Sequence, residues 1–372
     1  MLQKNYLVKV SCLCLVITLI AITGAGCGTR EASTGSGGAA PQTRTIVDQA
    51  GRKVTVPGEI NQVFSTNPVG SILMYTLAPE KLVAWNFEIG PEHKKYLLPA
   101  CRNLPNLGGW YANKSCNTEE LLKIGPDIII CSDDQTQVSL AERIQEQLHI
   151  PVVVFNDRLT GLDQTYEFLG ALLGAEEQAA ELAAYCRRSV DEVAEKAGLI
   201  PEEKRVRVYY AEGNQGLSTD PRGSRHTQVL DLVGGVNVAD VPLKGGMGMT
   251  SVSLEQILSW DPDVIITATL SGLGGQEGAI YHHVTTDPKW TGLKAVKEHQ
   301  VYDIPDKPFN WFDRPPSVNR IIGVKWLAHT LYPDIFKYDI REEIKDFYST
   351  FYHYDLTGRE IEDLLVRSQV NQ

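Results

Sequence analysis

The sequence contains no hydrophobic run long enough to cross a bilayer. Its longest uncharged apolar stretch runs from Val10 to Ile22, about 13 residues, whereas a membrane-spanning helix needs about 20. A basic start, a short apolar region and small residues after it are typical of an export signal. We therefore predict that residues 1–26 are a signal peptide.

An excess of positive charge is also missing. The 372 residues carry 35 Lys and Arg against 46 Asp and Glu, a formal net charge of −11, and no block of like charge occurs. A nucleic-acid partner requires clustered Lys and Arg to neutralise phosphates, so we predict none. A hydrophobic content of 43% with 22% charged residues is typical of a globular chain, and the length favours two cores over one.

The sequence also lacks the common catalytic motifs. "GGMGM" at residues 245–249 has no Lys or Ser/Thr of a phosphate-binding P-loop, and "GLSTD" around Ser218 lacks the second Gly of a G-x-S-x-G elbow. H-E-x-x-H and C-x-x-C are absent as well. We predict that the chain is not an enzyme, and an exported enzyme with a metal cofactor is the alternative from another class.

Cysteine is sparse, and one of its positions is informative. Cys27 follows "TGAG", and this ending resembles a bacterial lipoprotein signal, with Gly24 where such signals usually carry Leu. The resemblance implies cleavage before Cys27 and acylation of its thiol, which anchors a protein to a membrane without embedding it. Residues 27–43, rich in Gly, Ser, Thr and Ala, are predicted to form a flexible tether. Further on, Cys101 and Cys116 are candidates for a disulfide, and free thiols are the alternative.

The remaining chain alternates short β-branched runs with helical patterns. Such alternation predicts parallel sheets with helices on their faces. We predict an α/β fold of two Rossmann-like lobes with parallel-rich sheets, at residues 44–158 and 201–372. In the first lobe the expected strands are "RKVTV", "NQVFS", "KLVAWN", "PDIIICS" and "PVVVF".

One phrase occurs twice. "TEELLKIGPDIII" ends at Ile130 and "LEQILSWDPDVII" ends at Ile266, and the acids Glu119 and Glu255 are offset by 136 residues. Both copies combine a helical pattern with Pro-Asp and a β-branched apolar run. We predict that they occupy matching places in the two lobes.

Residues 159–200 are predicted to connect the lobes through helices. In "EEQAAELAAYCRRSVDEVAEKAGL" the apolar residues fall on one stripe at helical spacing, and Gly198 with Pro201 ends the pattern. A helix of about 22 residues spans roughly 33 Å. One continuous helix of this length resists hinge bending, so we expect only slight closure around a ligand.

Together these features resemble the substrate-binding proteins of ABC importers, in the group that serves iron–siderophores, haem and cobalamin. The resemblance also rests on the segments "IVDQAGRKVTVP", "DLVGGVNVA" and "KWTGLKAVKEHQVYDIP", and it covers nearly the whole mature chain. It implies a class III binding-protein fold, a site between the lobes, and a permease dimer with its cytoplasmic ATPase as partners. We expect an exported monomer, held on the outer face of the cytoplasmic membrane by its lipid alone.

The resemblance gives the repeated acids a role. In that family one carboxylate on each lobe pairs with arginines of the permease, and the matching residues are Glu119 and Glu255. Two acids at mirrored sites allow two-point electrostatic registration on a dimeric partner. The alternative is a purely structural role, because a Glu in the first turn stabilises the helix dipole and Thr118 and Ser253 are candidate N-caps.

The ligand is expected between the lobes, where loops at the strand ends face each other. Aromatic rings cover planar or apolar surface, and guanidinium groups pair with anions. The predicted ligand-binding residues are Trp85, Trp110, Tyr111, Tyr210, Arg222, Arg225, Trp311 and Arg314. Packing is the alternative for Trp311, and an ion pair with Asp313 or Asp306 is the alternative for Arg314.

The sequence says less about which ligand binds than about where it binds. We predict an iron complex, either a ferric siderophore or haem, with a corrinoid second and molybdate or tungstate third. Arginines favour an anionic ligand, and several tryptophans favour a larger organic complex. No resident cofactor or metal is expected.

Overall fold

The computed structural model describes residues 42–133, 135–243, 248–268 and 276–368. The predicted signal peptide, Cys27 and all but the last two residues of the predicted tether lie outside these ranges. Contacts divide the chain into residues 1–40 and 41–372, and the description below concerns the second unit. No helix within the described ranges is both long and apolar enough to cross a membrane.

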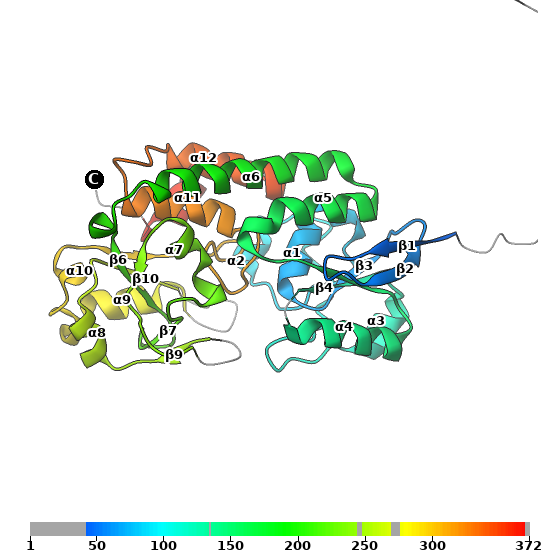
Figure 1. The fold of residues 1–372 in the computed structure, drawn as a ribbon, viewed down its shortest axis with the longest axis horizontal. Helices are drawn as coiled ribbons and strands as arrows, with labels where there is room; N and C mark the ends of the chain where they lie inside the picture. Colours follow the sequence, from blue (N-terminus) through cyan, green and yellow to red (C-terminus); the bar gives the residue numbers. More distant parts are fainter. Residues whose placement is uncertain (1–41, 134, 244–247, 269–275, 369–372) are drawn as a thin grey trace, which may run out of the picture. The chain divides into compact units, whose positions relative to one another are not determined.

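The first lobe is built on a three-stranded parallel sheet in the order β3–β4–β5 (Figure 1). Every residue of these strands is buried, as expected for apolar strands covered on both faces. Alternate residues point to opposite faces, so one face shares a core with α1 and α5 and the other with α3 and α4. In chain order the elements are β1 (Thr43–Val47), β2 (Lys53–Pro57), β3 (Val63–Ser65), α1 (Pro68–Leu77), η1 (Pro79–Lys81), α2 (Pro91–Lys94), α3 (Thr118–Ile124), β4 (Ile128–Ser132), α4 (Gln135–Leu148), β5 (Val152–Phe155), η2 (Leu159–Gly161) and α5 (Leu162–Leu173).

One predicted strand of this lobe is wrong. "KLVAWN" makes only isolated bridges, at Leu82 with Val63 and at Trp85 with Asn106. The reason is local, because η1 turns the chain just before it and the backbone of Trp85 then pairs with the following loop instead of extending the sheet.

The second lobe contains a four-stranded sheet in the order β11–β10–β6–β8, in which every pairing is parallel. A short antiparallel pair, β7 with β9, lies beyond the end of β6. Its elements are η3 (Glu202–Lys204), β6 (Arg207–Ala211), β7 (Ser218–Thr219), η4 (Arg225–Thr227), α7 (Gln228–Leu232), β8 (Val236–Asn237), β9 (Thr250–Ser251), α8 (Leu254–Trp260), β10 (Val264–Thr267), α9 (Ala279–Thr286), η6 (Pro288–Trp290), α10 (Lys294–Lys297), β11 (Val301–Asp303), α11 (Arg320–Leu331), α12 (Ile340–Phe347), η7 (Tyr348–Tyr352) and α13 (Gly358–Leu365). The predicted α/β fold with two parallel-rich lobes is confirmed.

The duplicated phrase forms the same structure in each lobe. It is a helix, α3 or α8, followed by a left-handed residue, Gly125 or Asp261, and by a buried parallel strand. The Asp of each Pro-Asp then binds the start of a neighbouring strand. Asp127 Oδ2 accepts hydrogen bonds from the amides of residues 61 and 62, and Asp263 Oδ2 accepts one from the amide of Arg207. The repeated residues therefore fix each helix to its sheet.

A single helix, α6 (Glu176–Gly198), runs along both lobes (Figure 1). Its 23 residues correspond to roughly 35 Å. The buried stripe includes Leu182, Cys186 and Val193, and the helix packs on α5 and α11. Gly170 of α5 is required where the two helices meet, because a Cβ there would collide with the Cβ of Ala179. We keep residues 159–200 as the proposed connecting segment.

The two lobes share one continuous core. The largest buried cluster runs from Val54 to Leu365 and includes residues of both sheets. The C-terminal helices contribute to it from the far end of the chain: the Tyr75 hydroxyl of α1 donates to the carbonyl of Tyr352 at 3.1 Å, and Tyr166 of α5 contacts Phe351. A core of this kind opposes large rotation of one lobe against the other.

The two cysteines predicted as a possible pair do not form a disulfide. Cys101 and Cys116, the candidates for a disulfide, are not bonded. Burial raises the pKa of the Cys101 thiol to about 11 and that of Cys116 to about 12, so both are protonated at neutral pH.

Candidate ligand-binding site

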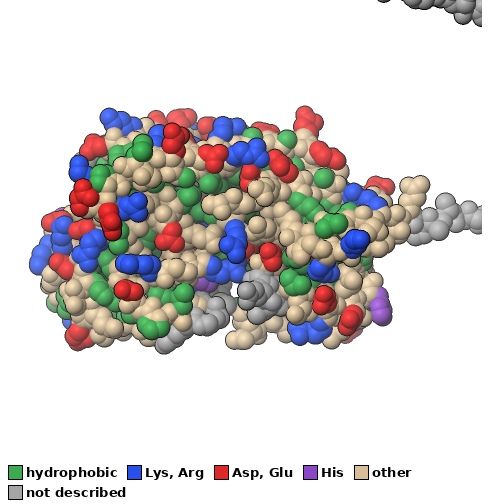
Figure 2. Space-filling model, viewed as in Figure 1, with side chains coloured by type: hydrophobic (Ala, Val, Ile, Leu, Met, Phe, Trp, Pro, Cys, Tyr) green, Lys and Arg blue, Asp and Glu red, His purple; other side chains and the backbone are tan. Residues whose placement is uncertain are grey.

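Loops at the carboxyl ends of the two sheets meet between the lobes. Asp157, which follows β5, accepts hydrogen bonds from Arg225 Nη2 on both carboxylate oxygens, at 2.8 and 2.7 Å. The backbone carbonyl of Asp157 accepts another from Arg320 Nη2 at 2.6 Å, and the Leu159 amide donates to Gln228 Oε1 at 2.9 Å. In Figure 2, Lys, Arg and His side chains lie beside a notch between the two halves of this face. This is the position at which doubly wound sheets bind ligands.

The wall formed by the first lobe is centred on the start of α1. Asn67 follows β3 and caps the helix, with its Oδ1 accepting from the Gly70 amide at 3.2 Å. Its Nδ2 donates to Ser132 Oγ, at the end of β4, at 2.6 Å. The Thr66 hydroxyl is buried and has no hydrogen-bond partner among the described residues. Helix N-termini favour anions, so this wall offers hydrogen-bonding groups and a positive dipole end.

A glycine allows the loop with Trp110 and Tyr111 to lie against this wall. A Cβ on Gly109 would collide with the carbonyl oxygen of Thr66, and the Trp110 amide donates to that oxygen at 2.8 Å. Trp110 packs edge-on against Phe64 of β3, and the Tyr111 hydroxyl donates to the Asn86 carbonyl at 2.9 Å. Both aromatic rings are half-buried.

The wall formed by the second lobe contains a buried cluster of charges. Arg314 Nε lies 2.6 Å from Glu212 Oε1 and 3.5 Å from Asp313 Oδ2, and Arg314 also pairs with Asp220. His226 Nδ1 lies 2.7 Å from Asp313 Oδ1. All three carboxylate side chains have no exposed surface.

Three carboxylates surround one guanidinium in this cluster, and the pKa values of Glu212 and Asp313 are shifted in opposite directions. Burial raises the pKa of Glu212 to about 8, against the opposing charge of Arg314, and Glu212 Oε2 has no hydrogen-bond partner in the described chain. Burial also disfavours the ionised form of Asp313, but His226 and Arg314 together hold its pKa below its ordinary value. The cluster therefore keeps Asp313 ionised and Glu212 protonated at neutral pH.

Asp220, His226 and Asp313 are also a candidate metal-binding group. Each offers one ligand atom, and these atoms lie within 4.8 Å of one another. Arg314 already pairs with both carboxylates, and His226 Nδ1 is directed at Asp313. Since a protein cation balances the carboxylates, we assign no metal to this group.

Three predicted ligand-binding residues lie in the core instead. Trp85, Tyr210 and Trp311 are 2%, 0% and 0% exposed. Trp85 donates through Nε1 to the Cys101 carbonyl at 2.8 Å, Tyr210 packs at a tilt against Phe312, and Trp311 lies against Tyr348.

The other five predicted ligand-binding residues lie in different environments. Arg314 forms the buried ion pairs described above, which is the structural alternative to a ligand contact. Arg222 is exposed, and its Nη2 donates to the Asn237 carbonyl at 3.1 Å. Arg225 lies at the contact between the lobes. Trp110 and Tyr111 are half-buried and belong to a loop of the first lobe.

Several residues at this face were not predicted from the sequence. Asn67, Asp157 and Arg320 are the clearest. Asn67 had a recognisable signal, because Asn directly before Pro is typical of a capped helix start. Arg320 had none: it lies in an apolar helix and is 2% exposed, and burial lowers its pKa to about 10.

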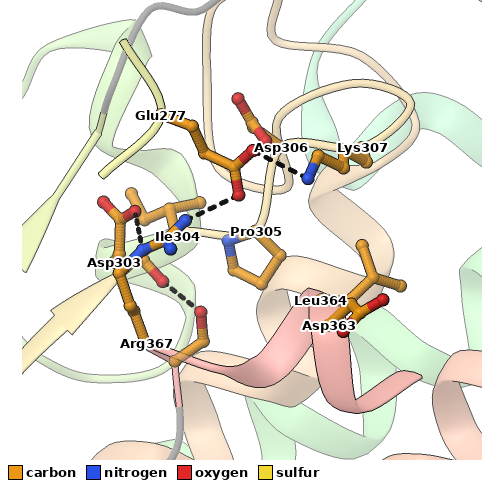
Figure 3. A pocket seen from close by; sticks show the side chains of 10 residues that line it. Glu277, Asp303, Ile304, Pro305, Asp306, Lys307, Asp363, Leu364 and Arg367 are labelled. Atoms are coloured by element: carbon orange, nitrogen blue, oxygen red, sulfur yellow. Dashed lines mark hydrogen bonds and ion pairs between the residues drawn. The ribbon is translucent and has the colours of Figure 1, made fainter. Parts of the chain in front are cut away.

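A second hollow lies at the end of β11 and is filled by ion pairs (Figure 3). Glu277 lies 2.7 Å from Lys307 and 2.7 Å from Arg367, and Arg367 lies 3.1 Å from Asp303. Burial raises the pKa of Asp303 to about 6. Because these charges are satisfied by one another, we assign no ligand here.

The repeated acids lie on the surface. The Glu119 side chain is 83% exposed and lies 3.1 Å from Lys123. Glu255 is also exposed, in the first turn of α8, whose N-cap Ser253 forms a capping box with Gln256. The N-cap of α3 is Asn117 and not Thr118, which is the first residue of the helix.

Known proteins identify the family to which this geometry belongs. Residues 79–308 match the family model described as "Periplasmic binding protein". The chain belongs to the periplasmic binding protein family. Members of this family are the solute-binding components of ABC transporters, so the predicted family and role are confirmed: this periplasmic binding protein captures a small molecule for a permease and its ATPase, and it is not an enzyme.

Individual relatives agree with this assignment. The molybdate-binding protein MolA of Haemophilus influenzae is 28% identical, over 83% of this chain and 91% of its own. The substrate-binding lipoprotein YvrC of Bacillus subtilis is 24% identical, over 86% and 96%. Among solved structures, a solute-binding protein from Sulfurospirillum deleyianum is 33% identical with a TM-score of 0.80, covering 87% of this chain and 99% of its own.

Proposed function

We propose that this periplasmic binding protein captures a small anionic metal species between its lobes, with molybdate or tungstate as the first candidate. The observation that carries the proposal is the contact of Arg225 with Asp157. An exposed arginine at the meeting of the two lobes already binds a carboxylate through both of its oxygens. The Arg225 side chain is 39% exposed, against 7% for Arg314 and 21% for Arg367, so an oxyanion can reach its guanidinium and replace the Asp157 carboxylate there.

The buried tryptophans shift the preference among ligands. Our prediction of a bulky iron complex or corrinoid depended partly on tryptophans lining the site. Trp85 and Trp311 are in the core, which leaves Trp110 as the one predicted tryptophan that is partly exposed. The arginines still favour an anionic ligand, because Arg222 and Arg225 are both exposed. An oxyanion, our third alternative from sequence, therefore moves to first place.

The first lobe supplies complementary groups. The N-terminus of α1 offers the positive end of its dipole, Asn67 caps it and binds Ser132, and Thr66 directly before the cap has a buried hydroxyl without a hydrogen-bond partner in the described chain. The proposed ligand-binding residues are therefore Trp110, Tyr111, Arg222, Arg225, Asn67 and Ser132. MolA, a relative named for binding molybdate, supports the same chemical class.

A thermal-shift screen of the full mature chain tests this proposal. Molybdate and tungstate should raise the melting temperature in a saturable way, whereas sulfate, ferric citrate, haem and cobalamin serve as the competing ligands. Arg225→Ala should abolish the shift, and Arg207→Ala, an exposed arginine that binds the Asp261 carbonyl, is the control. A shift with an iron complex or cobalamin alone would restore our original prediction for the ligand.

Anchoring and docking belong to the same proposal. We infer that Cys27 is acylated, that the protein is a monomer, and that Glu119 and Glu255 contact the permease. The word lipoprotein in the name of YvrC supports the anchor, and the exposure of both acids supports docking. Labelling with a radioactive fatty acid should mark the full chain and fail with Cys27→Ser.

A further inference from the structure

Two arginines bind one aspartate between the lobes. The carboxylate of Asp157 is buried, and both of its oxygens accept hydrogen bonds from one nitrogen, Nη2 of Arg225. The backbone carbonyl of Asp157 accepts a hydrogen bond from Arg320 Nη2 at 2.6 Å. The two arginines differ in their surroundings, because Arg225 is exposed and Arg320 is buried. An ion in solution can therefore reach the guanidinium of Arg225 and not that of Arg320.

A second set of hydrogen bonds holds the backbone near Asp157 without using its carboxylate. Besides the bond to the Asp157 carbonyl, Arg320 donates through Nη1 to Gln228 Oε1 at 3.1 Å. The Leu159 amide donates to the same Oε1 at 2.9 Å. Because Gln228 begins α7 and Arg320 begins α11, the backbone of residues 157–159 is bound to both helices. The carboxylate can therefore lose Arg225 while its backbone stays in place.

The charge of Arg320 remains near Asp157 when Arg225 moves away. Burial lowers the pKa of Arg320 to about 10, the charges of Asp157 and Asp313 oppose this shift, and the charge of Arg225 adds to it. Arg320 is thus protonated at neutral pH, and it is repelled by Arg225. A buried carboxylate that loses its cation is strongly disfavoured. Here one guanidinium stays beside the carboxylate, and its repulsion from the other is relieved.

We propose that Asp157 is a built-in competitor for the ligand, which occupies Arg225 until an oxyanion replaces it, and that Arg320 is the positioning residue that holds and balances the displaced aspartate. The inference rests on the proposed function and adds the residue that limits its affinity. The observed affinity is reduced in proportion to the fraction of molecules in which Arg225 is released from Asp157. Only an anion that pairs with a guanidinium can take the place of the carboxylate.

The substitution Asp157→Asn tests the competition. The full mature chain is titrated with molybdate by isothermal calorimetry. The amide keeps the size of the carboxylate and cannot form the ion pair, so Kd for molybdate should fall about tenfold if Arg225 is released in about a tenth of wild-type molecules. Asp163→Asn is the matched control, because it removes the carboxylate of an ion pair with Arg187 and changes the net charge by the same amount. The control should leave Kd unchanged.

A double-mutant cycle separates the positioning role of Arg320 from general support of the fold. Arg320→Gln keeps a donor for the Asp157 carbonyl and removes the charge. It should raise Kd for molybdate about tenfold in the wild-type background, where a charged aspartate must be displaced, and much less in the Asp157→Asn background. An equal increase in both backgrounds would contradict the positioning role.

The outcomes separate this inference from the proposed function. If the wild type binds molybdate and Asp157→Asn binds it no more tightly than Asp163→Asn, Asp157 is not a competitor. A crystal structure of the wild type with tungstate tests the same point without a variant. Arg225 should have left the Asp157 carboxylate while the hydrogen bonds of Arg320 and Leu159 are kept, and an intact pair of Arg225 with Asp157 beside bound tungstate would overturn the inference. If the wild type binds neither oxyanion, the proposed function fails and the inference fails with it.

Discussion

The substitution Glu212→Gln should remove the contribution of Glu212 to the pH dependence of the free energy of unfolding. In the folded protein, burial places the pKa of Glu212 at about 8 instead of its ordinary 4.5. The folded state therefore binds a proton that the unfolded state releases between these values. The stability that this proton provides is fully present below pH 4.5 and is lost as the pH rises through 8.

The magnitude follows from the two pKa values. Each unit corresponds to about 1.4 kcal/mol, and integration from pH 5 to pH 8 gives a loss of roughly 3–4 kcal/mol from this group. Glu212→Gln keeps the shape of the protonated acid and cannot ionise, so its free energy of unfolding should lack this loss. Subtracting the free energies of unfolding of the two proteins at each pH removes the contributions of the other titrating groups, which both proteins share.

Urea titrations at pH 5, 6, 7 and 8 measure this difference. The wild type should lose stability relative to Glu212→Gln as the pH rises, and the gap should be largest at pH 8. Parallel profiles for the two proteins would refute the reasoning, because they would mean that Arg314 keeps Glu212 ionised across the whole range.

The remaining predictions concern other parts of the molecule. Gly109→Ala should cost about 1–3 kcal/mol of stability in denaturant titrations, since its methyl group meets the Thr66 carbonyl, whereas Gly198→Ala meets open space and should cost nothing. Glu119→Ala with Glu255→Ala should weaken transport and leave ligand affinity intact, and lost ligand binding would contradict the docking role. Small-angle scattering should show only slight compaction on ligand binding, because α6 and a shared core join the lobes; a large closure would contradict this.

The fold was predictable from sequence because its signals are local. Unbroken β-branched runs at Ile128–Ile130 and Val152–Val154 are buried strands, and the stripe of residues 176–198 is one helix. The duplicated phrase was placed correctly in both lobes. "KLVAWN" failed because strand propensity does not show whether a segment pairs with a sheet or with a loop.

The site was less predictable because it depends on packing between distant segments. Tyr210 lies in β6, whereas Trp85 and Trp311 lie in loops. Their rings pack against aromatic residues distant in sequence: Trp85 against Phe309, Tyr210 against Phe312 and Trp311 against Tyr348. Arg314 finds its partners Glu212 and Asp220 about 100 residues away, and no spacing rule relates them. The contact of Arg225 with Asp157, which carries the proposed function, spans 68 residues and joins the two lobes.

The most direct test of ligand capture between the lobes is isothermal titration of the full mature chain with molybdate, repeated with Arg225→Ala. We predict one molybdate bound per chain by the wild type, and binding weakened at least tenfold, or lost, in the variant. Equal affinity in both proteins, or heat only from a second site unaffected by Arg225, would contradict an anion site at the interlobe face.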